Sequence, residues 1–166
     1  VVAKCGENVN IRRLTRVEGD VIGAYLHGNR IGVVVALSGG DTELAKDIAM
    51  HVAASSPQFL DPAQVSDEAI AKEKEIFLAL NEEKIKGKPD NIIENMVAGR
   101  IKKFLAEASL VEQAFVKNPE VTVGKLAQQA GATIVSFVRF EVGEGIDRGE
   151  VDFAAEVAAQ LAAAKK

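Results

Sequence analysis

The sequence predicts an α+β fold, in which helices pack on a small antiparallel sheet and an antiparallel helical hairpin is inserted into the chain. Runs of alternating or β-branched residues occur near the N-terminus and again after residue 132, and both predict strands. Amphipathic helical patterns fill the residues between them, and Gly and Pro separate the two kinds of segment. Strands, then helices, then a returning strand are typical of an α+β domain.

The first part of the sheet is predicted from three runs, at 9–17, 21–26 and 31–37. Apolar residues alternate with polar ones in the first run, and the other two are rich in β-branched residues. Gly28-Asn29 lies between the last two runs and predicts a two-residue hairpin, because the centre of such a turn needs φ values that Gly and Asn tolerate. His27 is therefore expected at the exposed tip of this hairpin.

A helix is predicted next, over residues 41–55, and it should pack on the sheet. Asp41 is a suitable N-cap, and Ile48 and Val52 follow at four-residue spacing on one apolar face. His51 shares that face. It is therefore expected to be a core histidine whose hydrogen bonds are satisfied.

Two charged helices follow, one over 66–81 and one after Asp90, with a Gly-Pro turn between them. Each has a narrow apolar face, so the two should pair with each other as a short coiled coil. Residues 61–108 are interpreted as an inserted, dimerisation-type helical hairpin. Residues 1–60 and 109–145 are interpreted as the α/β core subdomain.

The chain after the hairpin is expected to complete the sheet. Thr122 can cap a short helix, and Gly131 is well placed just after its end. The run at 133–142 is the clearest strand, with Ile134 and Val138 assigned to the same face. This strand should join the N-terminal strands.

The last residues, 146–166, predict a C-terminal helical module that carries Phe153 and Val157 at four-residue spacing. Lys165 and Lys166 lie at the end of this helix, where the helix dipole favours positive charge.

Composition narrows the classes of function. The 166 residues are 48% hydrophobic and 27% charged, as in an ordinary globular protein. The net charge of −4 argues against direct contact with nucleic acid, which usually requires a basic face. The single cysteine excludes an intrachain disulfide, and no apolar run approaches the roughly 20 residues of a membrane span.

No pattern in the sequence predicts an active site. Cys5 with His27 and His51 is a weak candidate for a nucleophile and its base, because no flanking catalytic motif accompanies it. These residues also fall short of a zinc pattern. The run at 143–145 lacks the glycine frame of a phosphate-binding loop. No catalytic residue, metal or cofactor is therefore expected.

Several runs together resemble the bacterial elongation factor Ts family, and the resemblance covers essentially the whole chain. They are GENVNIRR, EGDVIGAYLHGNRIGVVVA, DIAMHVAASSPQFL, MVAGRIKKFLAEASLVEQAFVKNP, FVRFEVGEGI and DFAAEVAA. The resemblance implies a cytoplasmic guanine nucleotide exchange factor that binds elongation factor Tu and promotes GDP release. It implies neither an enzyme nor a cofactor.

The resemblance also implies partner-binding residues. Positions matching Cys5 and Gly6 lie against the partner's nucleotide-binding domain in the family, and the position matching His27 docks on the partner's third domain. The helix around Phe153 resembles the module that also touches the nucleotide-binding domain. Most relatives have a larger aliphatic residue in place of Cys5.

Three functional readings follow. The chain begins at Val1 without a methionine, and it contains no Thr-Asp-Phe-Val run, the family motif that disturbs the partner's magnesium and nucleotide site. The first reading is therefore an exchange factor with impaired exchange. The second is a docking or dimerisation module without exchange, with self-association through the helical hairpin. The third is a small enzyme that uses Cys5.

Overall fold

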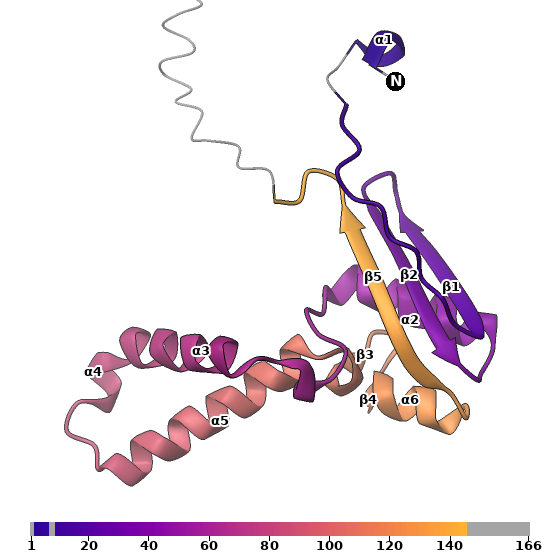
Figure 1. Ribbon diagram of the computed structural model, residues 1–166. Helices are drawn as coiled ribbons and strands as arrows, with labels where there is room; N and C mark the ends of the chain where they lie inside the picture. Colours follow the sequence, from indigo (N-terminus) through magenta and orange to yellow (C-terminus); the bar gives the residue numbers. More distant parts are fainter. Residues whose placement is uncertain (1, 7–8, 146–166) are drawn as a thin grey trace, which may run out of the picture.

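The computed structural model, which describes residues 2–6 and 9–145, contains a three-stranded antiparallel sheet. Its strands are β1 (Val21–His27), β2 (Ile31–Ser38) and β5 (Thr133–Glu141), with β2 in the middle. Figure 1 shows this sheet at one side of the molecule and a long helical hairpin projecting from it. The predicted α+β class is confirmed.

Helix α2 (Thr42–Ser55) packs on one face of the sheet, as predicted. Asp41 caps it, since its Oδ1 accepts a hydrogen bond from Leu44 N at 2.8 Å. At Gly23 a Cβ would lie 2.3 Å from the Ala45 carbonyl carbon, so glycine is needed for the close approach of β1 to α2. Side chains of the sheet and α2 share one core with others from the chain after the hairpin, among them Val33, Val35, Leu37, Ile48, Val52, Leu110 and Val123.

The inserted hairpin consists of α3 (Asp67–Leu80), the short α4 (Glu82–Ile85) and α5 (Asp90–Ala108). Helix α3 lies along α5, and the turn between them is at the far end from the sheet (Figure 1). No residue of α3 is buried, and Ala108 is the only buried residue of α5. The hairpin therefore has no hydrophobic core of its own.

The base of the hairpin is fixed to the rest of the chain by backbone hydrogen bonds. Phe59 and Ser109 form a parallel bridge. Gln58 N and Phe59 N both donate to Ala108 O, at 2.9 and 3.0 Å, and Leu110 N donates to Phe59 O at 2.9 Å. Leu110 then enters the main core with no exposed surface.

Short elements connect this base to the last strand. Thr122 caps α6 (Val123–Gln129) by accepting a hydrogen bond from Lys125 N at 3.3 Å, and Gly131 follows the helix with a φ of 64°, as expected. The sequence does not predict the small ladder formed by β3 (Ala114–Phe115) and β4 (Asn118–Thr122). The remaining elements of the described residues are α1 (Val2–Cys5), η1 (Pro62–Gln64) and η2 (Leu110–Glu112).

The predicted strand at 9–17 is wrong. Residues 9–19, called the leading segment below, contain no strand or helix and run along the sheet as a loop (Figure 1). Apolar alternation defines a strand only when one side is buried and a neighbouring strand pairs with it. Ile11 and Leu14 are instead 90% and 93% exposed.

The predicted faces of β5 are also wrong at its start. Leu37 pairs with Ile134 and Val34 pairs with Val138, and the register shifts between these pairs. Val135 is the extra residue of this β-bulge. The bulge turns Ile134 into the core beside Leu37, whereas Val138 lies on the opposite face.

Candidate functional site

The hairpin between β1 and β2 presents His27 at its exposed tip. His27 and Ile31 form the last pair of the ladder, and a three-residue turn that begins at Gly28 closes it, instead of the predicted two-residue turn. Tyr25 Oη lies 3.4 Å from His27 Nδ1. Within the described residues no hydrogen bond reaches the other ring nitrogen. The imidazole is thus oriented from one side and open on the other.

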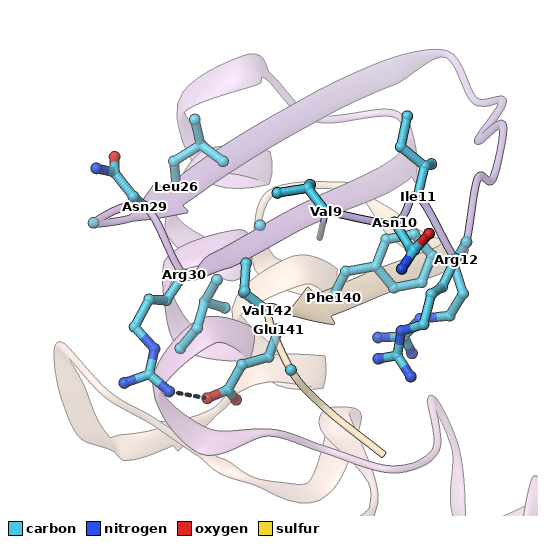
Figure 2. A pocket seen from close by; sticks show the side chains of 15 residues that line it. Val9, Asn10, Ile11, Arg12, Leu26, Asn29, Arg30, Phe140, Glu141 and Val142 are labelled. Atoms are coloured by element: carbon cyan, nitrogen blue, oxygen red, sulfur yellow. Dashed lines mark ion pairs between the residues drawn. The ribbon is translucent and has the colours of Figure 1, made fainter. Parts of the chain in front are cut away.

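The end of β5 lies beside this tip. Val142 N donates a hydrogen bond of 2.8 Å to Arg30 O in the turn. Figure 2 shows the Arg30 guanidinium facing Glu141, and the ion pair measures 3.8 Å. The hairpin tip is therefore joined to the last strand by both backbone and side chain.

The leading segment reaches the same end of the sheet. Arg13 Nη2 forms an ion pair of 2.8 Å with Glu144 Oε2, and its guanidinium lies 4.5 Å from the centre of the Phe140 ring. Arg12 Nη2 donates to the main-chain oxygen of Glu144. The hydrogen bond from Arg13 is the main reason that the pKa of Glu144 is lowered.

These three parts surround an open hollow of about 820 Å³. Figure 2 shows apolar side chains from the leading segment, β1 and β5 around it, with arginines at its margin. Exposed apolar patches rimmed by polar residues are typical of protein interaction sites. We call this region the docking end, and it comprises residues 9–13, 26–32 and 140–144.

His51 lies elsewhere, in the main core. It is 1% exposed, its Nε2 donates to Gln113 Oε1 at 2.9 Å, and its Nδ1 accepts from Val116 N at 3.2 Å. Burial lowers its pKa, which the Gln113 hydrogen bond only partly offsets. The predicted core histidine is confirmed. Because both ring nitrogens are engaged, His51 is not available as a base for Cys5.

The other sequence-predicted residues contribute less to the described site. Cys5 is the last residue of α1, and Gly6 follows it with a φ of 71°. Phe153 lies outside the described residues. Sequence reasoning missed Glu144 as a partner of Arg13, because the two are 131 positions apart and no local pattern links them.

Residues 2–6 and 9–145 contain no group of three or more His, Cys, Asp or Glu side chains arranged to hold a metal ion. No helix in that part of the chain is long and apolar enough to cross a bilayer.

An exposed end with apolar and charged side chains, carried on a packed sheet, is typical of α+β domains that contact other proteins. The chain belongs to the elongation factor Ts family, since the family's sequence model matches residues 1–144. Elongation factor Ts of Azotobacter vinelandii is 79% identical over 166 residues, which are 100% of this chain and 57% of the relative.

Two further relatives show a similar identity and coverage. Elongation factor Ts of Pseudomonas aeruginosa strain LESB58 is 80% identical over 100% of this chain and 57% of its own length. That of Stutzerimonas stutzeri is 76% identical over 100% of this chain and 58% of its own length. The chain therefore spans less than two thirds of the curated relatives it matches.

Proposed function

We propose that this chain is part of a guanine nucleotide exchange factor that binds elongation factor Tu and promotes GDP release. Family membership supports the activity. The observation that carries the binding role is the exposed His27 at the tip of a hairpin whose strands are anchored in the core. Binding residues on a turn held by a rigid scaffold are typical of recognition sites.

The proposed mechanism is differential binding. A factor that binds nucleotide-free elongation factor Tu better than its GDP form lowers the affinity for GDP by the same factor, because the two equilibria are linked. The chain needs no covalent step for this. His27, Gly6 and the module around Phe153 are its proposed contacts, and Cys5 adds a smaller apolar contact.

We expect this chain to bind better than it exchanges. The docking end is present, but the sequence contains no Thr-Asp-Phe-Val run. In the proposed division of labour, the docking end supplies affinity and that motif disturbs the magnesium site. GDP release should then be much slower with this chain than with the full-length relatives.

A second candidate function is self-association through the helical hairpin, without exchange. It is favoured by two neighbouring hollows on the hairpin that share Ala98. Ile93 and Val97 line one hollow, and Ile101 and Leu105 line the other. A second copy can cover this half-exposed apolar stripe.

Sedimentation of wild type and Val97→Glu tests this alternative. Self-association predicts a concentration-dependent dimer that the charged variant abolishes. A wild type that stays monomeric at all concentrations would eliminate the second candidate.

Titration of elongation factor Tu with wild type and His27→Ala tests the first proposal. Loss of an anchoring interface side chain typically costs about 1–2 kcal/mol, so affinity should fall by roughly five- to thirtyfold. The melting temperature should hardly change, because His27 is solvent-facing. Glu120→Ala, an exposed change on β4, is the control and should bind normally.

GDP-release rates measured on the same samples complete the test. Unchanged affinity in His27→Ala would remove this residue from the interface. Release as fast as with a full-length relative would contradict the proposed division of labour.

A further inference from the structure

Glu144 connects two parts of the chain that are far apart in sequence. Its carboxylate bonds Arg13 at 2.8 Å and lies 3.9 Å from Arg139 Nη1, and its main-chain oxygen accepts from Arg12. Arg12 and Arg13 belong to the leading segment, whereas Arg139 belongs to β5. One acidic residue therefore receives cations from both sides of the docking end.

The β5 side of this network is fixed. The Arg139 side chain is 13% exposed, and its Nη2 also bonds Glu141 Oε2 at 2.8 Å. Isolated surface ion pairs contribute little, but networks of several charges contribute more. Stacking of Arg13 on Phe140 adds a cation–π contact to the same attachment.

Regular secondary structure does not hold the leading segment in place. It contains no helix or strand, and the side chains of Ile11 and Leu14 project into solvent. The contacts of Arg12 and Arg13 attach its first half to the end of the sheet. Gly6 lies six residues before Arg12, a span of roughly 20 Å at most, so attachment of Arg12 limits how far Gly6 can lie from the end of the sheet.

We propose that Glu144 is a positioning residue: with Arg12 and Arg13 it forms a clamp that holds the leading segment on the end of the sheet, beside the His27 tip, and restrains residues 2–6 before a partner binds. This inference rests on the proposed function. The benefit is preorganisation, because a segment already ordered before binding loses less conformational freedom on association.

Release of the clamp should lower the affinity of the chain for elongation factor Tu by a factor that can be calculated. If releasing it leaves the binding-competent arrangement populated only 10–30% of the time, apparent affinity falls by about three- to tenfold. Glu144→Gln keeps the shape of the side chain but removes its ion pairs with Arg13 and Arg139, so it releases the Arg13 side of the clamp, while the bond of Arg12 to the main-chain oxygen remains. Glu18→Gln is the matched control, because Arg16 is the one ion-pair partner of Glu18 among the described residues and both side chains are largely exposed.

NMR relaxation of the free chain tests the clamp without any partner. In wild type, backbone order parameters of residues 10–13 should approach those of the sheet, and Arg13 side-chain protons should show a ring-current shift from Phe140. Both signatures should be weakened in Glu144→Gln and unchanged in Glu18→Gln. Order at 10–13 that is the same in all three proteins would overturn the clamp.

Titration with elongation factor Tu then tests the positioning role. Glu144→Gln should bind about three- to tenfold more weakly, with Glu18→Gln at the wild-type value. A released clamp with unchanged affinity would overturn the role. A wild type that does not bind would overturn the proposed function and the role with it, while the relaxation data would still decide whether the clamp exists.

Discussion

The sheet with α2 and the helical hairpin are stabilised in different ways. Leu37, Ile48 and Leu110 of the core have no exposed surface, and α2 is buried along a whole face. Helices α3 and α5 bury only Ala108 between them. The core therefore depends on removing apolar surface from water, whereas the hairpin depends on pairing and on the backbone hydrogen bonds at its base.

This difference bears on where function can reside. A docking residue must be held in place before its partner arrives, which requires a rigid support. The His27 tip extends from strands whose other ends lie in the core. The helical hairpin of α3 and α5 lacks such support, and it should open locally more often than the sheet does.

The largest expected difference in the free energy of unfolding is between alanine substitutions of two leucines, one in each region. Leu110→Ala should lower the free energy of unfolding by about 2–5 kcal/mol, because it leaves a cavity in a fully buried site. Leu78→Ala, in a half-buried position on α3, should cost about 1 kcal/mol or less. Urea unfolding measures both. Equal losses would contradict the distinction between core and hairpin.

A smaller loss of stability is expected at His51, where α2 contacts the chain that follows the helical hairpin. His51→Leu leaves Val116 N–H and Gln113 Oε1 without their partner, at a cost of about 1–3 kcal/mol. Equilibrium unfolding at pH 8 measures this. A variant as stable as wild type would show that these two bonds contribute nothing net.

The free energy of unfolding should also depend on pH, because of the same histidine. Burial lowers its pKa below 6.5, so the unfolded chain binds the proton more strongly than the folded one. Its contribution to stability is complete above pH 6.5 and declines as pH falls below 6.5 towards the lowered folded-state pKa. The stability difference between wild type and His51→Leu should therefore shrink on acidification. His27→Ala, the change at the other histidine, should leave this decline intact.

The smallest expected change in stability concerns the ion pair that joins α3 to α5. Arg100 contacts Glu73 at 2.6 Å, and the Glu73 side chain is only 14% exposed. A double-mutant cycle with Glu73→Gln and Arg100→Gln should give a coupling of about 0.5–1 kcal/mol. Lys103 and Glu107, a more exposed pair at 3.6 Å, should give about half as much or less. Reversed magnitudes would argue against a role for the partly buried pair.

The elements that could be predicted from sequence are those encoded locally. Helix α2 was predictable because Asp41 and the four-residue apolar spacing lie within one short window, and the burial of His51 followed from that spacing. The turn residues placed the His27 tip correctly to within one position. The paired hairpin helices followed from their narrow apolar faces.

The failures involve information that is not local. The run at 9–17 alternates like a strand, but no neighbouring strand pairs with it, and pairing is a property of the whole fold. The bulge at Val135 depends on the register with β2. The bond between Arg13 and Glu144 joins the two sides of the docking end, and no sequence period indicates it.

Native-state hydrogen exchange tests the central claim most directly, because it reports the opening of the core and the hairpin in one experiment. Amides of residues 33–37 in the central strand should exchange only through global unfolding, together with those β5 amides that face β2. Amides of α3 and α5 should exchange on the order of 100-fold faster, through local opening. Equal protection in the hairpin and the central strand would contradict the account.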